Sequence, residues 1–216
     1  MVLENISIFL QKGKAKDVRI LVQEALDANF SPQDILNEGL ISGMNVIGAK
    51  FKKNEVFVPE VLVAARAMNA GLEILRPILA QAGVEPIGKA LICTVKGDLH
   101  DIGKNLVKMM LEGQAIECID LGVDVDSDTI INAIKENKPD LVCLSALLTT
   151  TMMEQRTIIE EIEKSSLRDQ VMIMVGGAPV TDDFAKEIGA DAFSADAASA
   201  AEMAVKLLKE RKLANV

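Results

Sequence analysis

The sequence has no tryptophan, no tyrosine and a single histidine, His100, among its 216 residues. Nucleic-acid binding generally requires a basic surface and often aromatic rings that stack on bases, whereas this chain carries a net charge of −9. One histidine also cannot build an ordinary zinc site, which takes three or four protein ligands. These absences argue against nucleic-acid binding and against a conventional zinc centre.

The sequence also lacks a membrane-spanning segment, a signal peptide and any cysteine spacing typical of a metal site. No apolar run approaches the length of a membrane span, and residues 1–5 lack the basic start of a signal peptide. We therefore expect a cytoplasmic protein that does not associate with membranes. The three cysteines, Cys93, Cys118 and Cys143, each fall in an apolar run and share no ligand spacing. We interpret them as buried thiols in a reducing compartment.

The first region of the chain, residues 1–86, has helical periodicity only. Residues 14–28 place apolar side chains on one helical face, and Ser31 before Pro32 is a typical helix start. Another long helix is expected to begin at Pro59. We predict a four-helix bundle, because each amphipathic helix must bury its apolar face.

The second region, residues 87–216, alternates strands with helices. The predicted strands are residues 90–95, 116–121, 141–145, 171–175 and 191–194. Their near-continuous apolar character is typical of parallel strands covered on both faces. We predict an α/β fold with a flavodoxin-like, Rossmann-type sheet of five parallel strands.

A polar segment, residues 96–105, follows the first predicted strand and contains His100. Open α/β sheets bind their ligands at the carboxyl ends of strands, where this turn falls. A neutral imidazole is a transition-metal ligand, and Asp98 could orient it through the other ring nitrogen. A single histidine completes a metal site only if a cofactor supplies the remaining ligands, as in a haem or a corrin. The alternative is that His100 is a solvated or structural loop histidine.

The later turns at the same edge are small or polar. Residues 145–151 are rich in hydroxyls, Gly176-Gly177 has no side chains, and residues 195–197 are small apart from Asp196. Together they predict a slot for a long, flat ligand. The alternative is that each turn merely caps the helix that follows.

The chain resembles the cobalamin-binding corrinoid proteins of methyltransferase systems. The resemblance rests on Asp98-x-His100-x-x-Gly103, on Ser145-x-Leu147 and on Gly176-Gly177, three motifs in the family's order. It extends over nearly the whole chain and includes the corresponding two domains of cobalamin-dependent methionine synthase. It implies a helical cap domain in residues 1–86 and a cobalamin-binding α/β domain in residues 87–216.

The resemblance also implies roles for individual residues. His100 would be the lower axial ligand of cobalt and would displace the cofactor's own base, the base-off/His-on arrangement. Asp98 would hold the imidazole, and Thr151 would hold Asp98. Gly103 belongs to the same cofactor-binding motif. The slot for the displaced nucleotide tail would be lined by Ser145, Leu147, Thr149, Gly176, Gly177 and Ala197. In the cap, the residues that would shield the upper corrin face are Phe51, Val58 and Val61.

The function implied is that of a methyl carrier. Such a protein accepts a methyl group on the cobalt of cobalamin or a related cobamide from a substrate:corrinoid methyltransferase. It passes the group to a second methyltransferase whose acceptor is tetrahydrofolate or a thiol. A reductive activase is a further expected partner. We expect no turnover by the isolated chain, and the sequence does not identify the methyl donor.

Four alternatives share parts of this pattern. The small cobalamin-binding subunit of a radical mutase shares the Asp98–Gly103 motif but has no need of the cap. A cobalamin-dependent sensor would add a DNA-binding segment, and residues 1–30 hold no basic helix of that kind. A phosphoacceptor signalling domain would have a lysine after the fifth strand, where residues 195–197 stand. A dinucleotide-binding domain would have Gly-x-Gly-x-x-Gly in the first turn.

Overall fold

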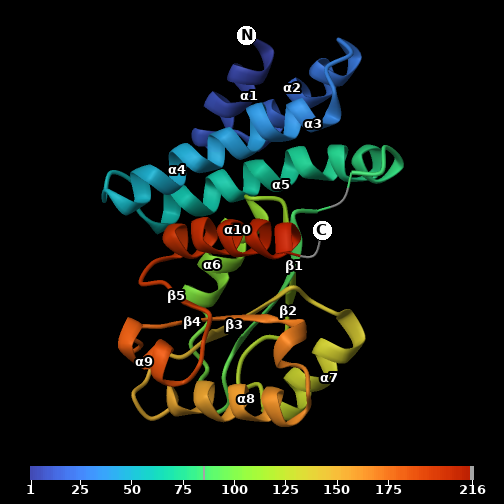
Figure 1. Ribbon diagram of the computed structural model, residues 1–216. Helices are drawn as coiled ribbons and strands as arrows, with labels where there is room; N and C mark the ends of the chain where they lie inside the picture. Colours follow the sequence, from blue (N-terminus) through green and yellow to red (C-terminus); the bar gives the residue numbers. More distant parts are fainter. Residues whose placement is uncertain (85, 215–216) are drawn as a thin grey trace. The chain divides into compact units, whose positions relative to one another are not determined.

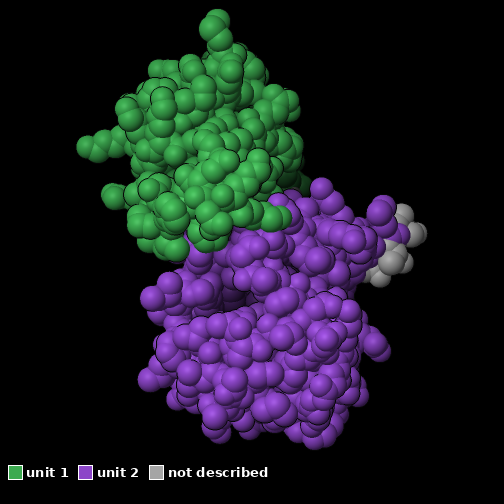
Figure 2. Space-filling view, turned by 90° about the vertical axis from the view of Figure 1, so that its left-hand side faces the viewer, with its two compact units in different colours: residues 1–86, 113–115 green, residues 87–112, 116–216 purple. Residues whose placement is uncertain are grey.

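A computed structural model describes residues 1–84 and 86–214. Contacts within the chain divide it into two compact units, coloured separately in Figure 2. Unit 1 comprises Met1–Pro86 and Gly113–Ala115, and unit 2 comprises Ile87–Glu112 and Ile116–Val216.

Unit 1 is helical throughout its regular structure (Figure 1). Its helices are α1 (Val2–Gln11), α2 (Ala15–Asp27), α3 (Pro32–Asp34), the π-helical segment η1 (Ile35–Ile41), α4 (Ser42–Lys52) and α5 (Val58–Gln81). The Ser31 hydroxyl accepts a hydrogen bond from the Asp34 amide at 3.0 Å, which caps α3 as predicted. Because α3, η1 and α4 run on without a break, the described residues form the four-helix arrangement that the sequence predicts.

The bundle core is built from the apolar stripes of these helices. Leu40 on η1 and Val18 on α2 are fully buried, and both lie against Gly71 of α5. A Cβ at Gly71 would lie 2.8 Å from a Leu40 methyl group. The absence of a side chain at this position therefore allows α5 to approach its neighbours closely.

Unit 2 is an α/β sandwich whose sheet is wholly parallel. Its strands are β1 (Gly88–Thr94), β2 (Ile116–Asp120), β3 (Leu141–Ser145), β4 (Met172–Gly176) and β5 (Ala192–Phe193). Its helices are α6 (Ile102–Glu112), α7 (Ser127–Asn137), α8 (Met153–Lys164), the short 3₁₀ turn η2 (Arg168–Gln170), α9 (Asp182–Glu187) and α10 (Ala197–Ala214). The strand order β2-β1-β3-β4-β5 is that of flavodoxin-like folds, which confirms the predicted fold class.

Helices cover both faces of this sheet. Figure 1 shows α6 and α10 on one face and α7, α8 and α9 on the other. Alternate strand residues such as Leu91, Val142 and Ile173 are buried in the core under α7, α8 and α9. Burial on both faces explains why the strands lack the polar alternation of a half-exposed sheet.

The sheet's carboxyl edge gathers the turns that the sequence singled out. Thr94 pairs with Ser145 across β1 and β3, and Ser145 pairs with Gly176 across β3 and β4. The chain leaves β1 toward β2 on one side, whereas β3 lies on the other side of β1. The carboxyl ends of β1 and β3 therefore form the topological switch point where such sheets bind ligands.

Helix α8 begins at Met153, which leaves Thr151 in the turn after β3. Cys93 and Cys143 are buried free thiols, but Cys118 is only partly buried because it lies in β2, an edge strand. Among the helices of residues 1–84 and 86–214, none has the length and apolar character needed to cross a membrane.

Candidate functional site

The turn between β1 and α6 holds His100 by its backbone as well as by its side chain. The Thr94 hydroxyl donates a hydrogen bond to the His100 carbonyl at 2.9 Å. The His100 amide donates to the Asp98 carboxylate at 3.0 Å. Gly97 adopts a φ of +78°, a backbone conformation that side chains disfavour, and so turns the chain out of the strand. The sequence thus folds this loop into a tight, internally bonded turn.

Asp98 is the buried centre of this turn, with no exposed surface. Its Oδ1 lies 2.7 Å from Nδ1 of His100 and also accepts the His100 amide. Its Oδ2 accepts the Leu147 amide and the Thr151 hydroxyl, both at 2.7 Å. A carboxylate has about four lone-pair positions, and all of them are used here. The buried charge is therefore fully hydrogen-bonded.

This environment fixes the charge of Asp98. Burial by itself raises the pKa of its carboxyl group. The hydrogen bonds from Thr151, Leu147 and His100 outweigh burial and hold the pKa of Asp98 well below its ordinary value. An ionised carboxylate only accepts hydrogen bonds, so Nδ1 of His100 carries the proton. In the neutral imidazole Nε2 then presents a lone pair.

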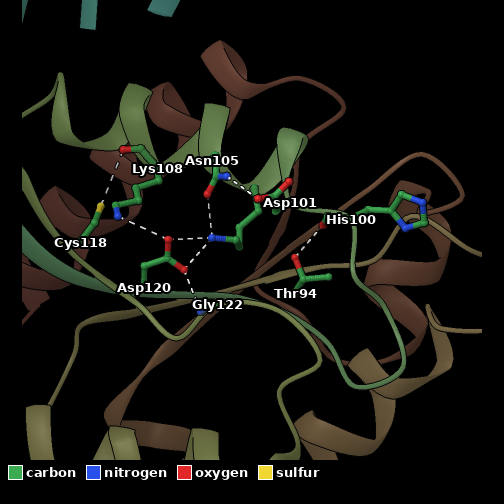
Figure 3. A network of polar contacts seen from close by, with 9 residues as sticks. Thr94, His100, Asp101, Asn105, Lys108, Cys118, Asp120 and Gly122 are labelled. Carbon is green, nitrogen blue, oxygen red and sulfur yellow. Dashed lines mark hydrogen bonds and ion pairs between the residues drawn. The ribbon is translucent and has the colours of Figure 1, made fainter. Parts of the chain in front are cut away.

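The accessible part of His100 is suited to ligation. Its side chain is 52% exposed, and Figure 3 shows the ring turned away from the polar network behind it. Within the described residues, no group of three or more His, Cys, Asp or Glu side chains could hold a metal ion. A single fixed imidazole therefore fits a metal that brings its other ligands with it, as in a corrin.

The predicted slot residues lie on three adjacent turns at the carboxyl edge. Leu147 and Thr149 are exposed, Ser145, Gly176 and Gly177 are partly exposed, and Ala197 at the start of α10 is buried. Five of the six residues thus present surface, and the Ala197 side chain presents almost none.

The motif glycines Gly177 and Gly103 differ in their surroundings. A Cβ on Gly177 would lie 1.7 Å from the Ala146 carbonyl oxygen, so the fold itself requires glycine there. A Cβ on Gly103 would meet nothing within 4 Å, and the residue is exposed. The folded chain therefore gives no steric reason for glycine at position 103, which leaves room for a bound group.

Of the exposed apolar side chains around His100, only Leu147 was identified from the sequence. Leu99 is 70% exposed and Ile102 is 75% exposed, and they flank His100 in the same turn. Leu147 and Leu148, whose backbones bond to Asp98 and Thr151, are 43% and 42% exposed. Four exposed apolar side chains beside one imidazole form a surface suited to a large apolar macrocycle. The sequence feature that could have indicated this surface is the presence of apolar residues within a turn that is otherwise polar.

Gln155 is a second residue that the sequence did not single out. It is fully buried in α8, and its amide nitrogen donates to the Leu144 carbonyl at 3.0 Å and the Gly176 carbonyl at 3.1 Å. It thereby ties the carboxyl ends of β3 and β4 together beneath the slot residues. The signal was its spacing from Ile158 and Ile162 on one helical face.

The three predicted residues of unit 1 differ in accessibility. Phe51 and Val58 are partly exposed, but Val61 is fully buried in the bundle core. Leu62, one turn after Val58 on α5, is 41% exposed, and Phe57 at the start of α5 is 62% exposed. Only Phe51 and Val58 of the predicted set therefore present side-chain surface.

Comparison with known proteins matches both units. Residues 88–205 match a family described as B12 binding domain, and residues 2–76 match a second family with the same description. The monomethylamine corrinoid protein 1 of Methanosarcina mazei is 43% identical over 194 residues, which cover 88% of this chain and 89% of that protein. The trimethylamine corrinoid protein of Methanosarcina barkeri is 42% identical over 179 residues, covering 82% of each.

A solved structure shows the same likeness in three dimensions. A chain of the methanol:cobalamin methyltransferase complex from Methanosarcina barkeri is 28% identical, with a TM-score of 0.84. The match covers 96% of this chain and 80% of that chain. Together, these relatives and the two family matches show that the chain belongs to the cobalamin-binding corrinoid proteins of methyltransferase systems.

Proposed function

We propose that this protein is a methyl carrier. It would accept a methyl group from a donor bound on a partner methyltransferase and deliver it to an acceptor on a second one. The relatives are corrinoid proteins of monomethylamine, trimethylamine and methanol systems, which supports a small methylated compound as the donor. The observation that carries the proposal is the Asp98–His100 pair, which keeps the ring proton on Nδ1 and leaves Nε2 unprotonated on a half-exposed side chain, as ligation requires.

Cobalamin, or a related cobamide, would supply the cobalt centre that carries the methyl group. His100 would bind that cobalt from below through Nε2, in place of the cofactor's own base. Asp98 keeps the proton on Nδ1 and stabilises positive charge on the ring. Thr151 in turn donates to Asp98, and its position would influence how strongly the imidazole donates.

The displaced nucleotide tail would occupy the slot formed by the turns after β3 and β4. Ser145, Leu147 and Thr149 come from the first of these turns, and Gly176 and Gly177 come from the second. Ala197 would contribute backbone rather than side-chain surface because it is buried. Leu99 and Ile102 would pack against the macrocycle, and Gly103 would leave room for it.

Unit 1 would act as the cap that the resemblance implies, and its match to a B12 binding domain supports this assignment. Phe51 and Val58 would shield the reactive face, since both present apolar surface. Val61 is buried, so its contribution would be to the packing of α5. Acceptors of the second methyltransferase would be tetrahydrofolate or a thiol, and a reductive activase would restore the cofactor after oxidation.

The test is electron paramagnetic resonance of the protein loaded with Co(II) cobalamin. Because His100 is the only histidine, protein enriched in ¹⁵N-histidine should show a changed nitrogen coupling relative to the ¹⁴N protein. His100→Ala should abolish the effect of the label while retaining much of the cofactor binding, because the slot is intact. An identical spectrum for labelled and unlabelled wild-type protein would disprove His100 ligation.

A further inference from the structure

A second segment, residues 120–125, contacts the His100 turn at several points. The Gly122 carbonyl accepts a hydrogen bond from the Thr94 amide at 2.9 Å, and the Val125 amide donates to the Thr94 carbonyl at 3.1 Å. Thr94 in turn donates its hydroxyl hydrogen bond to the His100 carbonyl. The segment therefore fixes the residue that holds the His100 backbone.

Asp124 forms hydrogen bonds with the start of the same turn. Its carboxylate accepts the Gly97 amide at 2.7 Å, and its own amide donates to the Asp98 carbonyl at 3.0 Å. Asp124 adopts a φ of +54°, which is uncommon for a residue with a side chain. Asp124 thus keeps a less favoured backbone conformation while it forms two hydrogen bonds with Gly97 and Asp98, just before His100.

Asp120 anchors the other side of the turn through Lys104, which stands in the first turn of α6. Lys104 is only 3% exposed, and its Nζ lies 2.6 and 2.7 Å from the two Asp120 oxygens. The Lys104 Nζ also donates to Asn105 Oδ1, and the Gly122 amide donates to Asp120 (Figure 3). Lys108 adds a weaker contact with Asp120 at 3.4 Å. Lys104 is buried and Asp120 is 21% exposed, so the pair is partly shielded from water and loss of either member weakens the anchor.

Residues 120–125 thus bond to the chain on both sides of His100. Asp124 holds Gly97 and Asp98 before it, and Asp120 holds Lys104 four residues after it. Asp98 and Thr151 orient the ring, and the Asp98 carboxylate also accepts the His100 amide. Gly122, Asp124 and Val125 bond to the backbone of residues 94–98, whereas Asp120 bonds to the Lys104 side chain. The segment therefore holds the two ends of the turn, and Asp98 holds the ring.

We propose that residues 120–125 are the positioning element of His100, with the Lys104–Asp120 ion pair as its anchor. This inference rests on the proposed function, in which His100 is the cobalt ligand. Lys104, Asp120 and Asp124 are positioning residues in this proposal and do not touch the cofactor. Loosening the segment should let the imidazole leave the orientation in which Asp98 holds its Nδ1 proton.

The first test uses the protein without cofactor and follows the one histidine by ¹⁵N nuclear magnetic resonance. At pH 8, above the ordinary histidine pKa of about 6.5, the ring nitrogen shifts report the tautomer. Wild-type protein should show the Nδ1-protonated form alone. Lys104→Met and Asp124→Gly should populate the second tautomer, whereas Asp124→Asn keeps an acceptor oxygen for Gly97 and should retain the wild-type spectrum. Glycine tolerates the positive φ of this position, so Asp124→Gly removes the side-chain bond to Gly97 without straining the backbone.

A matched control separates positioning from general loss of stability. Arg168 precedes β4 at the opposite edge of the sheet and bonds Asp191, Gly189 and Val171. Arg168→Met should lower the unfolding temperature and leave the histidine spectrum unchanged. The proposal is overturned if Arg168→Met perturbs the spectrum as much as Lys104→Met does, or if both Lys104→Met and Asp124→Gly leave it unchanged.

The second test uses the same variants loaded with Co(II) cobalamin. If the segment positions His100, Lys104→Met should reduce the affinity of the cobalt for the imidazole about tenfold or more, seen as loss of histidine nitrogen coupling. If the wild type shows histidine nitrogen coupling and the variants show the same coupling, the positioning proposal is overturned and the proposed ligation stands. Absence of coupling in the wild type would instead disprove the proposed ligation, and the cofactor-free spectra would still decide whether the segment positions the ring.

Discussion

The Thr151 hydroxyl donates to the Asp98 carboxylate across 2.7 Å, although 53 positions separate the two residues in the chain. The same hydroxyl accepts the Leu148 amide at 3.3 Å. Thr151 is therefore part of the turn after β3 and a partner of the turn after β1. Through this bond the two turns of the topological switch point are joined behind His100.

Replacing Thr151 by valine should test the strength of that link. Valine keeps the shape of threonine but leaves one Asp98 lone pair without a donor. We expect Thr151→Val to lower the free energy of unfolding by about 1.5–3 kcal/mol, because the lost bond is to a charged group. Thr151→Ser keeps the hydroxyl and should lose much less. Urea unfolding of the cofactor-free proteins measures both, and equal losses in the two variants would contradict the role of the hydroxyl.

The depressed pKa of Asp98 predicts how stability depends on pH. A carboxyl group whose pKa is lower in the fold stabilises the fold above its unfolded pKa, and this contribution is lost as pH falls toward the folded value. The unfolded value is about 3.9. We expect Asp98→Asn to be less stable at pH 7, with the difference shrinking below about pH 4.

This comparison is best made in a His100→Ala background, so that the substitution at Asp98 does not also change an interaction with the imidazole. Urea unfolding of His100→Ala and of His100→Ala/Asp98→Asn should be followed from pH 7 to pH 3.5. A difference that stays constant over this range would show that Asp98 is not held ionised by its surroundings.

Much of this site follows from short motifs. The Asp98–His100 pair was predictable because two residues separated by one position in a turn can bond locally. Its link to Thr151 was available only through the family resemblance, since 53 positions intervene. The sheet topology likewise follows from five strand-helix repeats, with element ends differing from expectation by one or two residues.

The rest depends on tertiary packing that no local pattern encodes. Lys104 would ordinarily be assigned to the solvent, and only its contact with Asp120 explains its burial. Val61 was assigned to a ligand-shielding surface, but its side chain lies in the bundle core. Cys118 was expected to be buried, and the position of β2 at the sheet edge leaves it partly exposed.

The two glycines of the motifs should respond differently to alanine. Gly177→Ala forces a Cβ to within 1.7 Å of the Ala146 carbonyl oxygen and should cost about 3 kcal/mol of stability. Gly103→Ala meets no atom of the chain and should stay within about 0.5 kcal/mol of wild type. If a macrocycle packs over position 103, the second variant should nevertheless bind cobalamin more weakly. Thermal unfolding and equilibrium binding of the two variants distinguish these effects.

The cysteine thiols should be unreactive in the folded protein. Burial is the main cause that raises the pKa of Cys93 and of Cys118 to about 12, and it raises the pKa of Cys143 well above its ordinary value. At pH 8 the thiolate fraction should therefore be about a thousandfold below that of an ordinary cysteine. Iodoacetamide labelling with mass spectrometry should show slow modification of all three, and fast modification after unfolding. Rapid labelling of Cys118 in the folded protein would contradict this.

The last prediction concerns dependence on partners. The described residues contain no group of three or more His, Cys, Asp or Glu side chains that could hold a metal ion, and the three thiols are poor nucleophiles because of their raised pKa values. His100 is committed to the Asp98 pair. Under the proposed carrier function, activation of the methyl donor would come from a partner methyltransferase.

We expect no transfer of an isotopically labelled methyl group from a methylamine or from methanol when the donor-specific methyltransferase is left out. A thiol or tetrahydrofolate acceptor and its methyltransferase are present in every reaction, and the measurement is the appearance of label on that acceptor. Transfer should appear when the donor-specific methyltransferase is added, and His100→Ala provides the matched control with an altered cobalt environment. Because enzymes typically turn over at about 1 per second or faster, label transfer at that rate without the donor-specific methyltransferase would show that the protein activates the donor itself and is not only a carrier.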